Sequence, residues 1–456
     1  MTKTKGKTPR ELALLVLHAV EQDGAYANLE LNKVLEKYQP SKLDRGFITE
    51  LVYGTLRSLH HLDWVLGGFL SRPLNSLTPW IRNILRLGVY QIFYLDKVPP
   101  SAAVNEAVNL AKNYGHGGTV KFVNGVLRNL LRNKDNIEYP DLKKNPALHI
   151  SVVYSHPLWM VEKWLAQLGQ EATINLCRAN NEAPPTTIRT NTLRIERDAL
   201  VTKLSGEDLE VKETSFVPEG LRVEGFVSLG SLPAFKEGLF QVQDESSMLV
   251  GHICRPREGF FVIDACSAPG GKTTHLAQLM NNRGTIVALD IHPHKLGLIQ
   301  DNCHRLGITC VQPHNLDARQ LPGEWKEQAD LVLVDAPCSG LGVLRRRPDA
   351  RWRKEAQDLP AIQKLQLEIL DGAAQCVKPG GTLVYSTCTI TPEENTEVIT
   401  KFLAAHPEFA PEDLSPYLPK PLQQLNLPTA REGFIQLLPH LHGMDGFFIA
   451  RLNRRG

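Results

Sequence analysis

The chain has 456 residues, too many for one ordinary domain and enough for two to four domains with sizeable cores. Its 51 Lys and Arg nearly balance its 49 Asp and Glu, and 42% of its residues are hydrophobic, which is typical of a globular protein. No apolar stretch is long enough for a membrane span, and the basic N-terminus lacks a signal-peptide cleavage site. We therefore expect a cytoplasmic protein with no membrane partner.

The eight cysteines show no CxxC pair and no regular spacing. This disfavours a zinc site or a disulfide framework, and we expect no metal. Three histidines, His275, His292 and His294, complete no ligand set, and we expect them on the surface at helix starts. Most of the cysteines should be small buried side chains, namely Cys177, Cys254, Cys303, Cys310 and Cys376.

Residues 1–138 are predicted to form an all-α domain. Apolar positions recur at helical spacing after capping residues, and we expect helices to begin at Thr8-Pro9, Ser41, Thr78-Pro79, Ser101 and Thr119. This region carries 18 Lys and Arg against 12 Asp and Glu, a local charge of +6. The nearly neutral chain therefore contains a basic helical module and a slightly acidic remainder.

Two further domains are predicted. Residues 139–238 contain prolines, helical stretches and short alternating segments, which indicate a linker and a small α+β domain. Residues 239–456 alternate strands with helices, which is typical of a parallel α/β sheet. We expect its strands at 261–265, 285–290, 309–312, 331–335 and 382–386, and its helices at 272–281, 293–306, 356–377 and 393–405.

Residues 261–273 (FVIDACSAPGGKT) are predicted to form an apolar strand, a tight glycine turn and a helix start. Glycine lets a ligand approach the backbone, and the first amides of a helix are available to bind it. The segment is not a phosphate-binding loop, because Cys266 stands where that motif needs glycine, and the GxGxxG of dinucleotide sites is absent. We expect the cofactor to contact Ser267, Ala268, Pro269, Gly270, Gly271, Lys272 and Thr273.

Two aspartates after the following strands complete this predicted cofactor site. Asp290 lies 20 residues after Gly270, where a carboxylate accepts the ribose hydroxyls of a nucleoside. A cofactor with a ribose and no diphosphate is therefore predicted, and S-adenosyl-L-methionine fits. Asp317, after the third strand, lies where the edge of an adenine could be recognised.

Two cysteines, Cys338 and Cys388, follow the fourth and fifth predicted strands, where ligands of open α/β sheets bind. A thiolate can add to carbon 6 of cytosine, after which carbon 5 accepts a methyl group, loses its proton and releases the thiol. This chemistry needs an acid near the ring nitrogen and a lowered thiol pKa, and we expect Asp335 and Lys272 to supply them. The spacing does not choose between the two cysteines.

The motifs DACSAPGGKT, LVDAPCSGLG, YSTCT and the closing DGFFIAR make residues 240–456 resemble the RNA cytosine-5 methyltransferases. The resemblance implies a Rossmann-like class I S-adenosylmethionine methyltransferase fold. It also implies that Cys388 is the covalent nucleophile and that Cys338 assists product release. DNA cytosine-5 methyltransferases use the thiol of their Pro-Cys motif instead, so the presence of Cys388 favours RNA.

Residues 1–138 resemble NusB, an all-helical RNA-binding protein, notably in LVYGTLR at 51–57 and VNGVLR at 123–128. A NusB-like module fused to this catalytic domain is similar to the bacterial small-subunit (16S) rRNA cytosine-5 methyltransferases of the Sun (Fmu) type. Membership implies that residues 139–238 contain an RNA-recognition-like segment. It also implies that the substrate is 16S rRNA.

The segment after Cys338, residues 344–354, contains six basic residues, one acid and Trp352. Cations can neutralise RNA phosphates, and Trp352 could stack on a base or simply anchor the loop. The predicted RNA-binding residues are Arg345, Arg346, Arg347, Arg351 and Arg353.

The sequence thus predicts a monomeric enzyme that methylates carbon 5 of a cytosine in rRNA. The catalytic motifs do not distinguish rRNA from tRNA, so a tRNA substrate remains an alternative. A second alternative is a non-catalytic RNA-binding or assembly factor of NusB type, which the intact pair of Cys338 and Cys388 disfavours.

Overall fold

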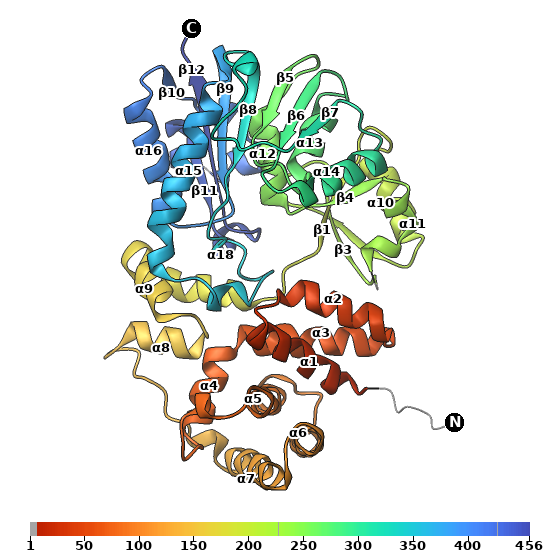
Figure 1. The fold of residues 1–456 in the computed structure, drawn as a ribbon, viewed down its shortest axis with the longest axis vertical. Coiled ribbons are helices and arrows are strands. Elements are labelled where there is room, and N and C mark those ends of the chain that lie inside the picture. The colour runs from red at the N-terminus through yellow and green to blue at the C-terminus, as the bar shows by residue number, and fades with distance from the viewer. Residues whose placement is uncertain (1–6, 227, 426) are drawn as a thin grey trace. The chain divides into compact units, whose positions relative to one another are not determined.

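The computed structural model describes residues 7–226, 228–425 and 427–456 (Figure 1). The chain divides into two compact units. Residues 1–182 together with 344–356 form one, called here the N-terminal unit, and residues 183–343 together with 357–456 form the C-terminal unit. Among the described residues, no helix is long and apolar enough to cross a membrane.

The N-terminal unit is helical. Its main helices are α1 (Pro9–Gln22), α2 (Ala27–Tyr38), α3 (Lys42–Arg57), α4 (Leu59–Gly67), α5 (Pro79–Tyr94), α6 (Pro100–Tyr114), α7 (Gly117–Asn133), α8 (Pro146–Val153) and α9 (Leu158–Asn181). Helices α1 to α7 bury one continuous apolar core of mainly leucine, isoleucine and valine side chains. This arrangement confirms the predicted all-α N-terminal domain.

Capping explains where several of these helices begin. The Thr8 hydroxyl accepts a hydrogen bond from the backbone N–H of Glu11, and the Ser41 hydroxyl accepts one from Asp44, so α1 and α3 begin as predicted. Helix α7 begins two residues before Thr119, whose hydroxyl instead pairs with the backbone of the N-cap residue His116. Helices α2 and α4 were not predicted.

Residues 183–242 of the C-terminal unit contain a four-stranded antiparallel sheet in the order β2-β3-β1-β4. Its strands are β1 (Thr187–Thr190), β2 (Glu210–Glu213), β3 (Gly220–Glu224) and β4 (Phe240–Val242), with helices α10 (Arg197–Ser205) and α11 (Pro233–Lys236). The predicted α+β character is confirmed. Because β4 pairs with β1, this sheet continues past residue 238, where the sequence placed the boundary.

The larger sheet has the order β10-β12-β9-β8-β5-β6-β7, with β11 beside β12. Strands β5 (Phe261–Asp264), β6 (Thr285–Leu289), β7 (Val311–His314), β8 (Ala329–Asp335) and β9 (Val377–Thr387) are parallel. Three further strands run antiparallel to their neighbours, namely β10 (Phe409–Pro411), β11 (Phe434–Leu437) and β12 (Phe447–Arg454). The sheet is therefore mixed and not wholly parallel, because the chain returns along β9 as β12.

Helices cover both faces of this sheet (Figure 1). Alternate residues of each strand point to opposite faces, so Val262 and Ile263 of β5 enter two different apolar cores. One core includes α12 (Glu245–Cys254), α13 (Gly271–Leu279) and α14 (Pro293–Leu306), and the other includes α15 (Leu359–Ala374) and α16 (Thr396–Ala405). This is the Rossmann-like layering predicted from the sequence.

Candidate active site

The glycine turn lies where β5 leads into α13. Gly270 has a φ of +96°, a left-handed conformation that glycine adopts without the strain a side chain would cause. A Cβ on Gly271 would meet no atom within 4 Å, so the backbone here is open to a ligand. The first turn of α13 therefore presents amides that a cofactor can approach.

The other predicted residues of the turn have different surroundings. Both the N–H and the hydroxyl of Ser267 donate to the carbonyl of Leu289 at 2.8 Å, which fixes the turn against the end of β6. The Thr273 hydroxyl donates to Asp264 Oδ2 at 2.7 Å, and both residues are fully buried. Ala268 is half-buried and Pro269 is exposed. The hydrogen bonds of Ser267 and Thr273 thus stabilise the conformation of the turn.

The two predicted nucleoside-binding acids follow β6 and β7. The carboxylate of Asp290 is 11% exposed, accepts the N–H of His292 at 2.8 Å, and lies 3.8 Å from the Lys295 ammonium. Asp317 is more exposed, and hydrogen bonds from Arg319 lower its pKa. Both acids therefore offer acceptor oxygens at this edge of the sheet, and Asp317 is already held by the Arg319 guanidinium.

Lys272 and Asp335 form an ion pair at the carboxyl end of β8. The Lys272 ammonium donates to Asp335 Oδ2 at 2.8 Å, and the hydroxyl of Ser386 donates to Oδ1 at 2.8 Å. Burial lowers the pKa of Lys272, but interactions with Asp335 and Cys388 raise it by more than burial lowers it, so the net shift is upward. Lys272 is thus a fixed cation whose charge also acts on Cys388.

The two candidate catalytic thiols meet at this end of the sheet. Cys338 follows β8, Cys388 follows the neighbouring β9, and their Sγ atoms lie 3.3 Å apart. Contact with Cys388, burial and the carboxylates of Glu394 and Asp335 raise the pKa of Cys338 well above its usual value. Cys338 therefore keeps its proton. The structure brings together Cys338, Cys388, Asp335 and Lys272, the four residues selected as catalytic.

One residue that the sequence analysis missed holds the two cysteine loops together. Glu394 is fully buried, and its carboxylate accepts the N–H of Ser339 at 2.7 Å, one residue after Cys338. It also accepts the hydroxyl of Thr391 at 2.7 Å, three residues after Cys388. Residues 391–394 (TPEE) look like a helix start, so the sequence indicates for Glu394 only a place in the first turn of the predicted helix at 393–405.

Close contact between Gly342 and Gly446 also contributes to the packing of the loops that contain Cys338 and Cys388. The Gly342 N–H donates to the carbonyl of Cys388 at 3.0 Å, and the Gly446 N–H donates to the carbonyl of Gly342 at 2.9 Å. A Cβ on Gly342 would lie 2.0 Å from the Gly446 oxygen. No side chain fits at this position without moving the backbone at Gly446 or Cys388.

The basic segment 344–356 folds within the N-terminal unit. Arg351 is fully buried and donates to the carbonyls of Ser155 and Asn180 at 2.9 and 3.0 Å. Trp352 Nε1 donates to the carbonyl of Leu56 at 2.7 Å, which anchors the segment. The structure therefore does not present Arg351 to solvent as expected of an RNA-binding residue, since both terminal nitrogens of its guanidinium donate to groups inside the N-terminal unit.

The other four arginines of the segment differ in exposure. Arg353 is half-buried and donates to the carbonyl of Gly24 at 2.7 Å. Arg345 is 5% exposed, Arg346 is half-buried and Arg347 is exposed. Arg347 is thus the predicted RNA-binding residue that lies most openly on the surface.

The histidine and cysteine predictions had mixed outcomes. His292 and His294 are exposed at the start of α14, as expected. His275 is fully buried within α13, so the expectation of a surface histidine was wrong, because α13 packs that face against α12. The five cysteines expected to be buried are buried, namely Cys177, Cys254, Cys303, Cys310 and Cys376.

Comparison with known proteins agrees with this arrangement. Residues 252–453 match the family described as 16S rRNA methyltransferase RsmB/F, residues 7–132 match the NusB family, and residues 156–230 match the ferredoxin-like domain of RsmF/B-like methyltransferases. The probable ribosomal RNA small subunit methyltransferase B of Bacillus subtilis is 41% identical over 99% of this chain and 100% of its own length.

Solved structures give the same result. The crystal structure of PH0851 is 30% identical, with a TM-score of 0.81 over 99% of this chain and 100% of its own. A methyltransferase homolog protein from Pyrococcus horikoshii is also 30% identical, with a TM-score of 0.57 over 68% of this chain and 99% of its own.

The fold, the site and these matches define an RNA methyltransferase with an N-terminal NusB domain and a ferredoxin-like middle domain. More particularly, the chain belongs to the 16S rRNA methyltransferase RsmB/F family. Membership implies S-adenosylmethionine as the methyl donor and RNA as the substrate.

Proposed function

We propose that this protein transfers a methyl group from S-adenosylmethionine to carbon 5 of a cytosine in 16S rRNA, through a covalent bond between that cytosine and Cys388. The observation that carries the proposal is the 3.3 Å contact between the Cys338 and Cys388 sulfurs, beside the ion pair of Lys272 and Asp335. An adenine or guanine methyltransferase has no use for two adjacent thiols at this position.

The cofactor site suits a nucleoside with a positively charged sulfur. The open backbone at Gly271, directly after the left-handed Gly270, suits the methionine end, and the Asp290 carboxylate offers acceptors for the ribose hydroxyls. We assign recognition of the adenine edge to Asp317. When bound, S-adenosylmethionine supplies an electrophilic methyl group.

The side chains then have distinct roles. The Cys388 thiolate adds to carbon 6 of the extruded cytosine, and the electron density gained at carbon 5 is used to accept the methyl group. Asp335, held by Lys272 and Ser386, faces the same end of the sheet and stabilises the proton on the ring nitrogen. After a base removes the proton from carbon 5, the bond between sulfur and carbon 6 breaks, and Cys338 assists this release.

The RNA is bound by surfaces outside this pocket. The family match at residues 7–132 supports binding by the NusB domain, and Arg347 is the exposed cation of the basic segment that we retain as a phosphate contact. We make no such proposal for Arg351, whose buried guanidinium already donates to the carbonyls of Ser155 and Asn180.

The test is methyl transfer from labelled S-adenosylmethionine to naked 16S rRNA and, in parallel, to tRNA, followed by complete digestion and identification of the labelled nucleoside. We expect 5-methylcytidine from 16S rRNA. Label in tRNA alone would show that tRNA, and not 16S rRNA, is the substrate. Label in a nucleoside other than 5-methylcytidine would contradict methylation at carbon 5 of cytosine. No label in either RNA would favour a non-catalytic binding or assembly factor.

A further inference from the structure

Three side chains outside the active site converge within the C-terminal unit. Glu219 immediately precedes β3, His252 lies on α12 and His275 lies on α13, and their ligand atoms all lie within 4.8 Å of one another. Glu219 Oε1 is 2.9 Å from His252 Nε2 and 2.8 Å from His275 Nε2. Two imidazoles and one carboxylate therefore point at a common centre.

His275 is the least satisfied member of this cluster. It is fully buried, and among the described residues neither of its ring nitrogens has an aligned hydrogen-bond partner, although Nε2 lies close to Glu219. Burial, assisted by the charge of Arg189, lowers the pKa of His275 to about 4. A neutral imidazole binds a metal through the lone pair of one ring nitrogen, and within the described part of the chain His275 has no other hydrogen-bond partner that would occupy it.

Glu219 supplies a negative charge at the same centre. Its side chain is only 7% exposed, so little of the carboxyl group is solvated by water. The nearby Arg189 does not hydrogen-bond to Glu219, since its guanidinium donates instead to Gln243, Gly271, Thr274 and Gln278. A buried carboxylate in this position is stabilised by a bound cation.

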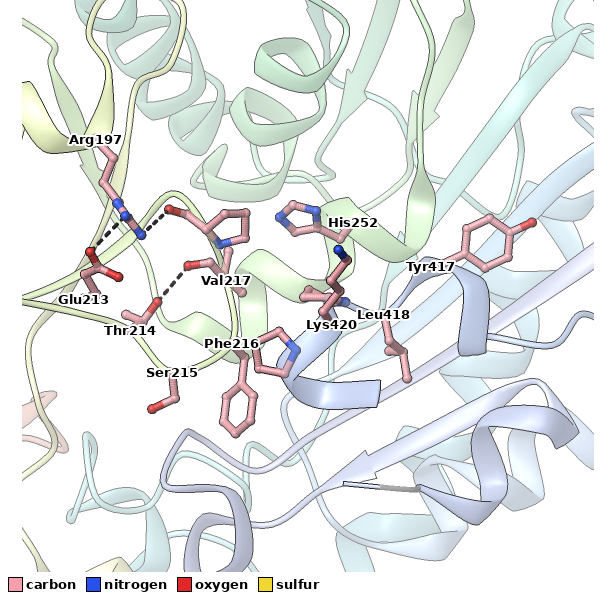
Figure 2. Close-up of a pocket in the computed structure, with 13 residues that line it drawn as sticks. Arg197, Glu213, Thr214, Ser215, Phe216, Val217, His252, Tyr417, Leu418 and Lys420 are labelled. Atoms are coloured by element: carbon pink, nitrogen blue, oxygen red, sulfur yellow. Dashed lines mark hydrogen bonds and ion pairs between the residues drawn. The ribbon is translucent and has the colours of Figure 1, made fainter. Parts of the chain in front are cut away.

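An access path exists on the side of His252. Its side chain is 21% exposed and lines a cavity of about 530 Å³ between the four-stranded sheet and the segment that contains Tyr417 and Lys420 (Figure 2). The Arg197 guanidinium at the far wall is paired with Glu213 at 2.9 Å. Solvent in this cavity can therefore reach His252, the member of the cluster that lines it.

We propose that Glu219, His252 and His275 bind one divalent metal ion of the zinc class, with water from the cavity as the fourth ligand. Two imidazole nitrogens, one carboxylate oxygen and a water form a set that zinc commonly accepts. Tetrahedral zinc separates its ligand atoms by about 3.3 Å. The two contacts of Glu219 therefore need to lengthen by about half an ångström, and the imidazole nitrogens, which lie within 4.8 Å of each other, need to settle at about 3.3 Å.

The consequence is structural and goes beyond the proposed function. The ion would join the four-stranded sheet, through Glu219, to α12 and α13 of the methyltransferase sheet. Helix α13 also carries the glycine turn at Gly270, so the metal would fix the helix on which the cofactor site is built. The sequence analysis expected no metal, because three ligands at unrelated spacings form no motif.

The test is calorimetric titration of the chelator-treated full-length protein with zinc chloride. We expect one equivalent to bind with a submicromolar dissociation constant and to raise the unfolding temperature. His252→Asn and Glu219→Gln should each weaken binding at least tenfold. His294→Asn, an exposed histidine on α14, is the matched control and should leave binding unchanged.

A second measurement separates this site from the thiol pair, which could also hold zinc. Cobalt(II) bound here should show visible ligand-field absorption without a thiolate-to-metal charge-transfer band, and Cys338→Ala should retain it. The assignment is overturned if the wild-type protein binds no zinc saturably, if binding survives in folded His252→Asn, or if it is lost in Cys338→Ala. Circular dichroism of each variant establishes that it is folded.

Discussion

The sulfur atoms of Cys338 and Cys388 lie 3.3 Å apart, although 50 residues separate them in the sequence. The contact arises because β8 and β9 are parallel neighbours, paired in register through Asp335 and Ser386, so both loops leave the same edge of the sheet. Contact with Cys388, burial and the nearby carboxylates of Glu394 and Asp335 raise the pKa of Cys338. The different roles that we propose for the two thiols are tested by the cysteine variants described last.

The first prediction concerns Glu394, which ties the two cysteine loops together. Glu394→Gln keeps the shape of the side chain, but it places an amide donor among groups that themselves donate to the carboxylate. We expect a loss of about 2–4 kcal/mol in unfolding free energy, since hydrogen bonds to a buried charge are worth about 1.5–3 kcal/mol. Urea denaturation measures it.

The matched control is Glu397→Gln, three residues further along the chain, because that side chain is 48% exposed on α16. It should change the unfolding free energy by less than about 0.5 kcal/mol. Equal effects of the two substitutions would show that Glu394 has no special structural role.

The second prediction concerns the contact between Gly342 and Gly446. Gly342→Ala would place a methyl group 2.0 Å from the Gly446 oxygen and 2.9 Å from the Cys388 oxygen, so the Cys388 loop must move. Because a displacement of about 1 Å can lower a rate about 100-fold, we expect a comparable loss in kcat. Steady-state methyl transfer measures it, and Gly323→Ala, where a Cβ meets nothing within 4 Å, should be silent. Normal turnover by Gly342→Ala would contradict the prediction.

The third prediction concerns pH and Asp264. Burial raises the pKa of Asp264 from 3.8 to about 7, although the hydrogen bond from Thr273 opposes this shift. Between these pH values the folded protein holds a proton that the unfolded chain has released, so this group makes stability fall as pH rises. The contribution reaches at most about 1.4 kcal/mol per pH unit.

Asp264→Asn removes this titration. We expect the wild-type protein to lose stability relative to Asp264→Asn as the pH is raised from 4 to 7, as measured by urea denaturation at each pH. Parallel stability curves for the two proteins would show that the pKa of Asp264 is not raised.

The fourth prediction separates the arginines of the segment 344–356. Arg347→Ala should weaken rRNA binding and reduce the slope of log affinity against log salt by about 1, because one phosphate contact is lost. Arg351→Ala should instead lower the unfolding temperature, since it leaves the buried carbonyls of Ser155 and Asn180 without a donor. A reversed pattern in filter binding and thermal unfolding would contradict these roles.

The sequence predicted well those features that depend on local chemistry. The caps at Thr8 and Ser41 located two helices, and the motifs around Gly270, Cys338 and Cys388 follow strand ends as predicted. These features are readable because capping, turn formation and strand termination depend on residues only a few positions apart.

Features that depend on distant partners were not readable. The sequence of an arginine-rich segment does not indicate whether its guanidinium groups donate hydrogen bonds to water or to buried carbonyls, so the packing of Arg351 could not be predicted. The burial of His275 and Glu394 likewise depends on elements far away in the chain. The antiparallel return of β12 depends on long-range pairing that the pattern of apolar residues did not specify.

The most direct test of the central proposal is the formation of a covalent RNA complex by matched cysteine variants. Wild type, Cys388→Ala and Cys338→Ala are incubated with 16S rRNA and S-adenosylmethionine and separated on a denaturing gel. We expect a stable protein–RNA band with Cys338→Ala, whose adduct is not released, and neither a band nor methyl transfer with Cys388→Ala. Methylation that survives in Cys388→Ala would contradict the assignment of Cys388 as the nucleophile.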